Sequence, residues 1–402
     1  MKIYLSLLRS PGVARIIAAQ LAARFPGGML SLAYLLHIER IHDSYGAAGL
    51  VLAANSVGSA IAGPLTSRWM GVWGMRPVLA ITTAVCALSI LTIGFVEMTI
   101  PITMLVGFIG GLSYPPVQPA VRTIYPKMVN SRQLTPLFSL DASAQEIIWV
   151  AGPVITTLVA TQISTVLAVV LCVVFLVGGG IWFISSPELG RVRIPRSKRA
   201  LGKVVTRPAV LLMTVVGITM VGSFAAVEAG VVATFGHGDP GSGIVLAVFA
   251  AGSLIGGLAF GHLSISPWTL ARRAGIILVG LSIAAFWLNI WWLSAALFIA
   301  GVGIAPALAA IFSVVSASVK FSDTAEAYGW VGTGQLMGAA LGSALAGFLI
   351  DANGAIGAYW ASIGLAVLTV AIAVVFHRHI PDLRGKDVGP QADTEPVPTQ
   401  PS

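Results

Sequence analysis

Long apolar runs separated by short polar breaks dominate the sequence from about residue 13 to residue 377. A helix needs roughly 17 to 25 apolar residues to cross the hydrocarbon core of a bilayer, which is about 30 Å thick. Twelve runs of this kind predict transmembrane helices over residues 13–38, 46–67, 77–96, 100–121, 136–160, 164–185, 208–235, 241–262, 274–292, 294–318, 325–350 and 355–377. The break between the ninth and tenth runs is the least distinct, because only Trp291, Trp292 and Ser294 mark it.

The composition agrees with a lipid environment. Of the 402 residues, 56% are hydrophobic and 9% are charged, whereas soluble globular proteins carry roughly 25% charged residues. A water-soluble fold could not bury so much apolar surface. Cys86 and Cys172 both lie inside apolar runs, without the spacing of a metal site or a redox motif, and are predicted to serve packing. The chain is therefore predicted to be an all-α integral membrane protein.

The basic residues predict how the helices are oriented. Lys and Arg are retained on the cytoplasmic side of short loops. If the N-terminus is cytoplasmic, every one of the 23 basic residues except Arg24 and Arg40 falls in an inner segment. Those segments include Arg68, Arg76, Arg122, Lys127, Arg132, Arg272, Arg273 and Lys320. This asymmetry predicts that both termini are cytoplasmic, and it explains the net charge of +8 without nucleic acid.

A basic stretch near the middle of the chain divides it into two parts. Residues 187–207 carry seven Lys and Arg residues against one acid, Glu188, and are predicted to form a cytoplasmic linker. Two six-helix bundles are expected on either side, over residues 1–186 and 208–380. Residues 381–402 are polar and rich in Pro, Asp and Gln, which predicts a disordered cytoplasmic tail.

An internal repeat relates these two parts. Gly49-Leu-Val-Leu-Ala53, followed by Gly58-Ser59, recurs as Gly243-Ile-Val-Leu-Ala247, followed by Gly252-Ser253, at an offset of 194. Phe138, Gln145 and Gly152 recur as Tyr328, Gln335 and Gly342 at an offset of 190, and Gly110 to Pro115 echoes Gly301 to Pro306 at 191. Each pair joins helix n to helix n+6. The pattern predicts two homologous bundles related by an axis along the membrane normal, with small residues where helix backbones approach closely.

With this duplication, residues from about 10 to 377 resemble the major facilitator superfamily. The resemblance implies two six-helix bundles that rock about a central site and expose it alternately to each side of the membrane. The family's signature between helices two and three corresponds to the gating-loop residues Arg68, Gly74 and Arg76. This chain has Gly71 and Val72 where the family usually has Asp-Arg, so the usual charge-based latch is not expected here. Gly152-Pro153 resembles the signature of proton-coupled exporters.

Ionisable groups inside the predicted helices are the candidates for coupling transport to the movement of protons. A charge near the bilayer centre costs roughly 2.5 to 3.5 kcal/mol on insertion scales and needs a partner, a wet cavity or a function. Arg24 lies halfway along the first helix and Glu146 at similar depth in the fifth, so an Arg24–Glu146 ion pair is expected. Asp141 lies nearer the cytoplasm, and Glu228 near the outer end of the seventh helix. The pair would serve proton coupling, helix packing or direct contact with the substrate.

Uncharged polar groups on the helices that line the family's cavity are candidate substrate-binding residues: Asn55, Tyr114, Gln118, Gln145 and Gln335. Such groups suit a neutral or weakly polar ligand, although each could instead form an interhelical hydrogen bond. The sequence contains no nucleotide-binding Gly-Lys-Ser/Thr loop and no constellation for covalent catalysis, so an enzyme is not expected. No metal or cofactor is expected either.

These features predict a monomeric secondary transporter of the cytoplasmic membrane. Its partners would be a small-molecule substrate, protons and membrane lipids, with no nucleic acid. Proton-coupled efflux is the leading hypothesis, since Gly152-Pro153 and the apolar helices favour export. A sugar or metabolite uniporter or symporter is one alternative. A non-transporting membrane receptor on the same fold is another, which flux into proteoliposomes would separate from a transporter.

Overall fold

The structure, a computed structural model, describes residues 2–197, 200–236 and 240–393. Within these ranges the secondary structure is helical apart from one isolated parallel bridge between Lys320 and Gln391. The helices are α1 (Lys2–Arg9), α2 (Val13–Arg24), α3 (Pro26–His42), α4 (Tyr45–Trp73), α5 (Met75–Phe95), α6 (Ile100–Leu112), α7 (Val117–Ile124), α8 (Ser131–Ala144), α9 (Glu146–Gln162), α10 (Thr165–Ser185), α11 (Pro187–Arg191), α12 (Pro208–Phe235), α13 (Pro240–Phe260), α14 (Thr269–Ala284), α15 (Ile290–Ser318), α16 (Thr324–Asn353) and α17 (Ile356–Val375). Short 3-10 turns η1 (Tyr125–Lys127), η2 (Phe321–Asp323) and η3 (His377–His379) complete the set.

Eleven helical segments in the described part of the chain are long and apolar enough to cross a membrane. They match eleven of the twelve predicted spans. The remaining span was predicted over 274–292, but α14 has 16 residues and ends at Ala284, and α15 begins at Ile290. The predicted break at Trp292 to Ser294 was therefore wrong. Asn289 accounts for the difference, because its side chain accepts a hydrogen bond from Trp292 N and caps α15.

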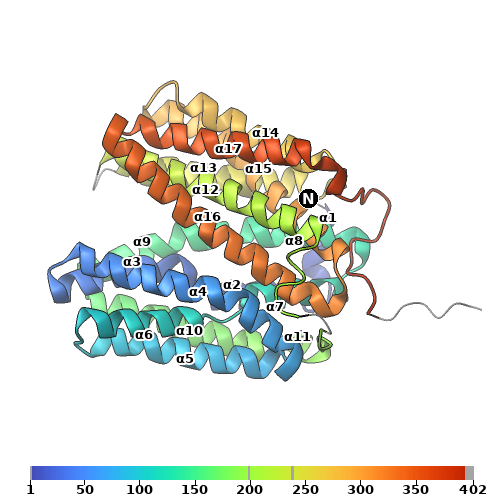
Figure 1. The fold of residues 1–402 in the computed structure, drawn as a ribbon, viewed down its shortest axis with the longest axis horizontal. Helices are drawn as coiled ribbons and strands as arrows, with labels where there is room; N and C mark the ends of the chain where they lie inside the picture. Colours follow the sequence, from blue (N-terminus) through green and yellow to red (C-terminus); the bar gives the residue numbers. More distant parts are fainter. Residues whose placement is uncertain (1, 198–199, 237–239, 394–402) are drawn as a thin grey trace, which may run out of the picture.

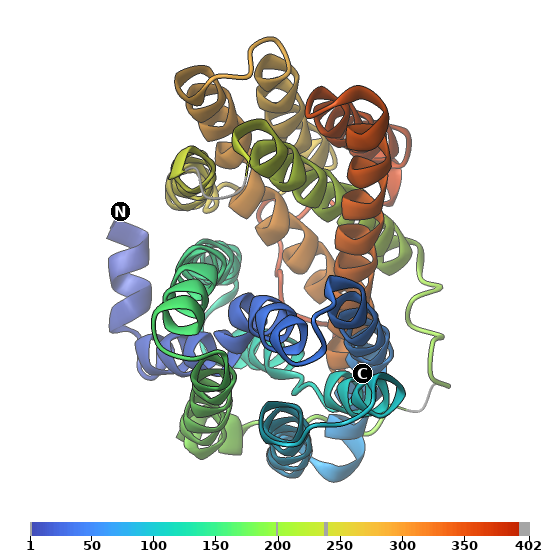
Figure 2. The ribbon, with the colours of Figure 1, turned by 90° about the vertical axis from the view of Figure 1, so that its left-hand side faces the viewer.

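The helices form two groups, which we call the first half (α2 to α10) and the second half (α12 to α17). Figure 2, which looks along the helices, shows the two groups side by side. The N-terminus, the segment between the halves and the C-terminal segment all lie at one end of the molecule, which we call the terminal end (Figure 1). Between the terminal end and the opposite end the helices run nearly parallel, as expected for a membrane-spanning bundle.

Glycine contacts show that the two halves repeat the same packing. A methyl group on Gly152 of α9 would lie 2.8 Å from the backbone carbon of Gly28 in α3. The equivalent Gly342 of α16 meets the backbone of Gly222 in α12 in the same way. These glycines allow the close backbone approach that lipid-embedded helices use in place of a hydrophobic driving force. The predicted duplication is thus present in three dimensions.

One offset of the repeat needs correction. Gly111 of α6 packs against the backbone of Asn55 and Ser59, and Gly301 of α15 packs against the backbone of Phe249 and Ser253. Gly301 therefore corresponds to Gly111, not to Gly110, and the offset for this pair is 190, not 191. The helix contacts decide the register, because Gly111 and Gly301 both face the backbone of the neighbouring helix, whereas Gly110 faces the side chain of Ser89.

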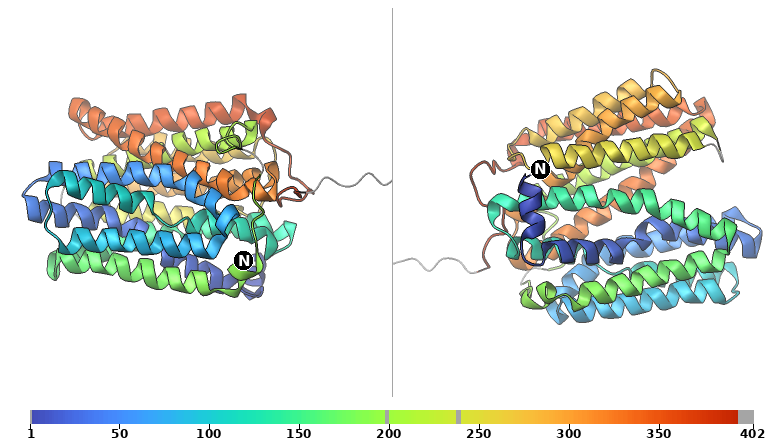
Figure 3. Two further views of the ribbon diagram at one scale, coloured as in Figure 1. Left: turned by 60° about the horizontal axis from the view of Figure 1, so that its bottom comes forward. Right: turned by 180° about the vertical axis from the view of Figure 1, so that it is seen from behind.

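The two halves meet at the terminal end and in the middle of the molecule, and they diverge toward the opposite end (Figure 3). The closest crossing is between α4 and α16, where a methyl group on Gly63 would lie 3.0 Å from Gly329 O. Thr333 Oγ1 donates to Ala60 O at 2.8 Å beside this crossing. All hydrogen bonds and ion pairs that the structure describes between the halves lie at the depth of Thr333 and Glu146 or closer to the terminal end.

The segment after η3 differs from the expected disordered tail as far as residue 393. Leu383 N donates to Ile265 O at 3.0 Å, and Gln391 forms backbone hydrogen bonds with Val319 and Phe321. Asp387 accepts a hydrogen bond from Ser131 of the first half at 2.6 Å. Burial of Leu383 and Val388 explains the order, because these two apolar side chains interrupt the polar composition. The rest of the predicted tail, 394–402, lies outside the described residues.

Candidate functional site

A cluster of charged and amide side chains is buried within the first half, and Asp141 of α8 lies at its centre. The Asp141 carboxylate is fully buried. Its Oδ1 accepts from Gln20 Nε2 at 2.9 Å and lies 3.4 Å from Arg24 Nη1, while its Oδ2 lies 3.1 Å from Arg122 Nε. Arg24 also donates to Gln20 Oε1 at 2.8 Å and to Gln145 Oε1 at 2.6 Å. One carboxylate thus pairs with two arginines, and the amide oxygens of Gln20 and Gln145 accept further hydrogen bonds from Arg24.

Helix interruptions place these residues. Gln20 and Arg24 end α2, where Phe25 and Pro26 separate it from α3. Arg122 lies on α7, after the break at Ser113 to Pro116, and Asp141 lies on α8, which stops before Gln145 and Glu146. The corresponding helices of the second half, α12, α15 and α16, are continuous. Interrupted helices inside a membrane bundle are tolerated where they line a cavity or are covered by protein, and they commonly mark binding sites in transporters.

Arg122 connects this cluster to the second half. Its guanidinium carbon lies 3.3 Å from the centre of the Phe312 ring of α15, which is a cation–π contact. The Gln118 side-chain oxygen, oriented toward the guanidinium, accepts from Arg122 Nη1 and Nη2 at 2.5 and 2.7 Å. Arg122 is only 2% exposed, so it has almost no contact with water.

Four aromatic rings close the space between the halves beside Arg122. Phe138 lies 6.2 Å from Tyr328 and 6.3 Å from Phe312, measured between ring centres, and 5.9 Å from Tyr125. Phe138 and Tyr328 occupy equivalent positions of the repeat, as do Arg122 and Phe312, whose numbers differ by the same 190. Residues related by the pseudo-twofold axis therefore meet on it. We call these four rings with Arg122 the aromatic closure.

The expected Arg24–Glu146 ion pair does not form, since Arg24 bonds to Asp141, Gln20 and Gln145 instead. Glu146 begins α9, after the break, and the turn there directs its carboxylate away from Arg24 and toward the second half. Ser253 Oγ of α13 donates to Glu146 Oε1 at 2.8 Å. Glu228 lies on α12 of the second half and is exposed.

The candidate substrate-binding residues divide into two groups. Gln118 and Gln145 belong to the buried cluster around Asp141. Asn55 donates to Gly107 O at 3.0 Å and thereby joins α4 to α6, and Gln335 packs against Gly217 of α12. Tyr114 stands at the break after α6, where its hydroxyl faces Gly27 of α3. Asn55 thus acts in helix packing, whereas Tyr114 lies beside the cluster.

The gating-loop residues have three different roles. Arg68 of α4 donates to Glu326 of α16 at 2.7 Å, so it forms an ion pair between the two halves at the terminal end. Glu326 Oε1 also accepts from Gly202 N at 2.8 Å. Gly74 has a φ of +90°, a conformation that favours glycine, at the turn between α4 and α5. Arg76 Nη2 donates to Ser186 O within the first half. We call this Arg68–Glu326 ion pair the latch; it forms although the usual Asp-Arg is missing.

Exchanging the charges of this latch tests its contribution. Glu326→Arg should place two cations together and favour opening of the terminal end, while Arg68→Glu combined with Glu326→Arg should restore much of the closure. The measurement is the alkylation rate of a cysteine at Ser313, which is fully buried between α15 and α8 in this structure. Equal rates in the single and double variants would show that the attraction between the two side chains does not hold the end closed.

Sequence reasoning missed Gln20, Arg122, Ser253, Phe312 and Glu326. Arg122 was assigned to an inner loop because the predicted span ended at residue 121, whereas α7 continues to Ile124. The apolar residues on both sides, Val121 and Ile124, were the available signal. Ser253 and Phe312 are ordinary helix residues whose importance comes only from what the other half places opposite them. Among the described residues, no group of three or more His, Cys, Asp or Glu side chains could hold a metal ion.

A duplicated bundle of membrane-spanning helices with a buried charge cluster at its centre defines a polytopic membrane protein of the transporter type. The sequence model of the Major Facilitator Superfamily matches residues 16–273 and, in a second match, 225–400. The chain therefore belongs to the Major Facilitator Superfamily. No curated protein matches the sequence significantly.

Solved structures share the fold over nearly the whole chain. A bacterial homologue of the iron transporter ferroportin, in an outward-facing state, has a TM-score of 0.73 at 12% identity and covers 91% of this chain and 99% of its own. The human organic anion transporter MFSD10 (TETRAN) has a TM-score of 0.70 at 14% identity, with coverages of 90% and 100%. The E. coli fucose:proton symporter FucP has a TM-score of 0.70 at 13% identity, with coverages of 92% and 98%. At these identities the likeness establishes the fold alone.

Proposed function

We propose that this protein is a secondary transporter that exports a small molecule across the cytoplasmic membrane by alternating access, in exchange for protons. The observation that carries the proposal is the position of Asp141. Its carboxylate pairs with two arginines deep in the bundle, and one of these arginines touches the second half through Phe312. A change in the charge of one buried group would thus act on the contact between the halves.

The orientation follows from the basic residues. Arg68 near the end of α4, Arg76 at the start of α5 and Arg191 at the end of α11 lie at the terminal end, which we place in the cytoplasm by the positive-inside rule. With this orientation the halves are in contact on the cytoplasmic side and diverge toward the outside, and we therefore interpret the arrangement as an outward-facing state. The contacts that must break for inward opening are the Arg68–Glu326 latch, the α4–α16 crossing and the aromatic closure.

Protonation of Asp141 would weaken that closure. With the carboxylate charged, two arginines share one anion, and the guanidinium of Arg122 is held under Phe312. Once the carboxylate is neutral, Arg24 and Arg122 repel each other in a medium of low dielectric constant, and an arrangement that separates them becomes favourable. A proton entering from outside would therefore favour inward opening, and its release to the cytoplasm would restore the closed terminal end.

We place the substrate site between the halves, on the outer side of the aromatic closure. Glu146 of α9 bonds to α13 across this space, Glu228 lies exposed on α12, and the Tyr114 hydroxyl faces Gly27 of α3. Because Glu146 bonds to Ser253 across the interface, substrate that displaces this bond would be sensed by both halves. Glu146 is also partly exposed and would receive a proton before Asp141, which lies on α8, on the cytoplasmic side of the helix break.

Transport driven by an imposed pH gradient tests the proposal. Purified protein in proteoliposomes would be offered the compounds that raise its thermal stability in a small-molecule panel. Counterflow of the substrate should occur without a pH gradient. A proton gradient directed opposite to substrate movement should drive the substrate to accumulate against its own concentration gradient. Glu146→Gln should reduce the gradient-driven component more than counterflow if it relays protons. Counterflow that is insensitive to the gradient in the parent protein would indicate a uniporter, and stabilisation by a compound that never moves would indicate a receptor.

A further inference from the structure

Helix α1 lies across the terminal end instead of along the bundle. Figure 2 shows it from the side while the long helices are seen end-on, and Figure 3 shows the same crossing from another direction. Tyr4 and Leu7 are buried against the protein, whereas the side chains of Leu5 and Leu8 are 53% and 41% exposed. In a helix with 3.6 residues per turn, Leu5 and Leu8 share one face that is turned away from the bundle. An apolar face at this level of a membrane protein is suited to the boundary between headgroups and acyl chains.

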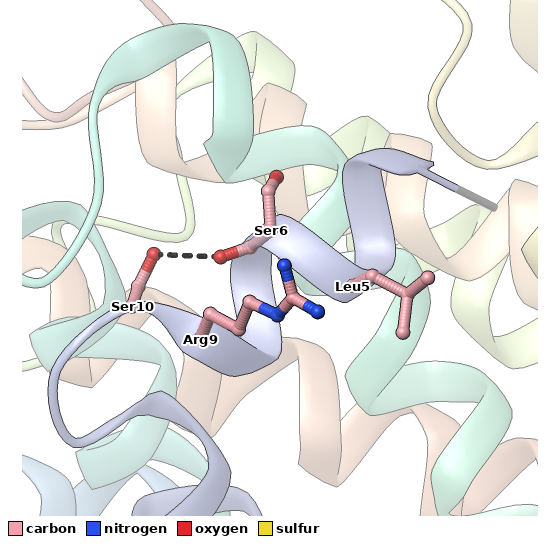
Figure 4. A pocket seen from close by; sticks show the side chains of 4 residues that line it. All are labelled: Leu5, Ser6, Arg9 and Ser10. Carbon is pink, nitrogen blue, oxygen red and sulfur yellow. Dashed lines mark hydrogen bonds between the residues drawn. The ribbon is translucent and has the colours of Figure 1, made fainter.

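A cationic side chain borders this apolar face. Figure 4 shows the shallow pocket formed by Leu5, Ser6, Arg9 and Ser10, in which Ser10 Oγ donates to Ser6 O at 3.2 Å. Arg9 is exposed, and in the described part of the chain its guanidinium forms no ion pair. By contrast, the next arginine along the chain, Arg15, pairs with Glu188. Arg9 is therefore available for an anion from outside the protein.

Helix α1 also joins the two halves. It leads directly into α2 of the first half, yet Tyr4 Oη donates to Gly257 O of α13 at 2.7 Å. Ser139 Oγ of α8 donates to the same carbonyl at 2.9 Å. This contact lies on the seam between α8 and α13, which must separate when the terminal end opens. The position of α1 and the closure of the terminal end are thus physically connected.

We propose that α1 docks on a bilayer surface containing anionic phospholipid, with Leu5 and Leu8 among the acyl chains and Arg9 on a lipid phosphate, and that docking stabilises the closed terminal end through Tyr4. The combination of an exposed leucine pair with an adjacent unpaired arginine favours a phospholipid over a free phosphate ion, since a free ion has no use for the leucines. The effect on closure rests on the alternating-access cycle proposed above, whereas the docking itself does not.

Fluorescence from a dye on Leu8→Cys tests docking in the full-length protein. Cys86 and Cys172 are buried, so labelling is selective. In vesicles of phosphatidylcholine with phosphatidylglycerol, the emission of an environment-sensitive dye should shift to the blue and be quenched by brominated acyl chains. Replacing phosphatidylglycerol by phosphatidylcholine, or making Arg9→Gln, should lower the docked-to-undocked ratio about fivefold. A water-exposed signal in anionic vesicles, an unchanged Arg9→Gln variant, or the same shift from inorganic phosphate with phosphatidylcholine alone would each overturn the docking.

Alkylation of Ser313→Cys tests the effect on closure. The rate should be several-fold lower in anionic vesicles than in phosphatidylcholine. Tyr4→Phe, which keeps the ring and loses the hydroxyl that bonds to Gly257 O, should remove this lipid dependence while leaving the dye signal of docking unchanged. Equal alkylation in both lipids with α1 docked would refute the link to closure alone. A protein that transports nothing but still shows the dye shift would refute the proposed function and leave docking intact.

Discussion

Asp141→Asn is expected to abolish proton-driven transport and to lower the stability of the protein markedly. The asparagine cannot neutralise Arg24 and Arg122, which are 12% and 2% exposed, respectively. Removing one partner of a buried ion pair typically costs about 3–5 kcal/mol, because the remaining charge is left uncompensated. We expect a clear decrease in the midpoint of thermal unfolding in detergent and no accumulation under a proton gradient.

A double variant separates the charge from the shape of the side chain. Asp141→Asn combined with Arg122→Gln removes one anion and one cation and should recover a substantial part of the lost stability, since fewer charges are buried without a partner. Gradient-driven transport should remain absent, because the titrating group is gone. If Asp141→Asn alone transports against a proton gradient like the parent protein, Asp141 has no part in coupling.

The sequence was sufficient to predict the architecture because the membrane imposes strong and regular constraints. Every spanning helix needs a long apolar run, and every close helix crossing needs small residues, so the runs and the glycine repeat both appear in the chain itself. Gly152 and Gly342 were identified as equivalents from spacing alone, and they pack against equivalent glycines, Gly28 and Gly222. The short helix α14 was the exception, because its end depends on the Asn289 cap more than on hydropathy.

The candidate site was predicted only in part. The fold could be predicted from the internal repeat, but the site residues of the first half are not repeated in the second half. Arg24 and Asp141 were recognised as charges that need partners, but which partner each takes depends on the helix breaks at Phe25 and Gln145. At the positions that the repeat makes equivalent to Arg24 and Asp141, the second half has Ile218 and Val331. The buried charge cluster around Asp141 is therefore confined to the first half, and the second half contributes Phe312, which Arg122 contacts.

The Arg68–Glu326 latch also could not be predicted from the sequence. The motif between the second and third predicted helices lacks the usual Asp-Arg, which argued against a latch. Arg68 nevertheless finds an acid 258 positions away in the chain, on the first turn of α16. The sequence alone does not show which residues pair across the interface of two bundles, because the local pattern contains no information about which helices of the two halves face each other.

The second large effect is expected from Gly329→Ala, at the α4–α16 crossing. The added methyl carbon would lie 2.5 Å from Gly63 O and 2.9 Å from the Cα of Pro64, well inside normal contact. Two helix backbones cannot yield locally as a flexible side chain could, so the halves must separate at this point. Overpacking of this kind typically costs about 1–3 kcal/mol. Only the closed state of the terminal end bears this cost, and the equilibrium should move toward opening by about tenfold.

Gly332→Ala is the matched control for this steric effect. It lies three residues further along the same helix, and a methyl group there would meet no neighbouring atom within 4 Å. Alanine also forms helix better than glycine by about 1 kcal/mol, so the control should be neutral or slightly stabilising. Alkylation of Ser313→Cys from the terminal end should therefore rise about tenfold with Gly329→Ala and stay unchanged with Gly332→Ala. Equal rates in the two backgrounds would mean that the α4–α16 crossing does not separate when the terminal end opens, and that the halves pivot elsewhere.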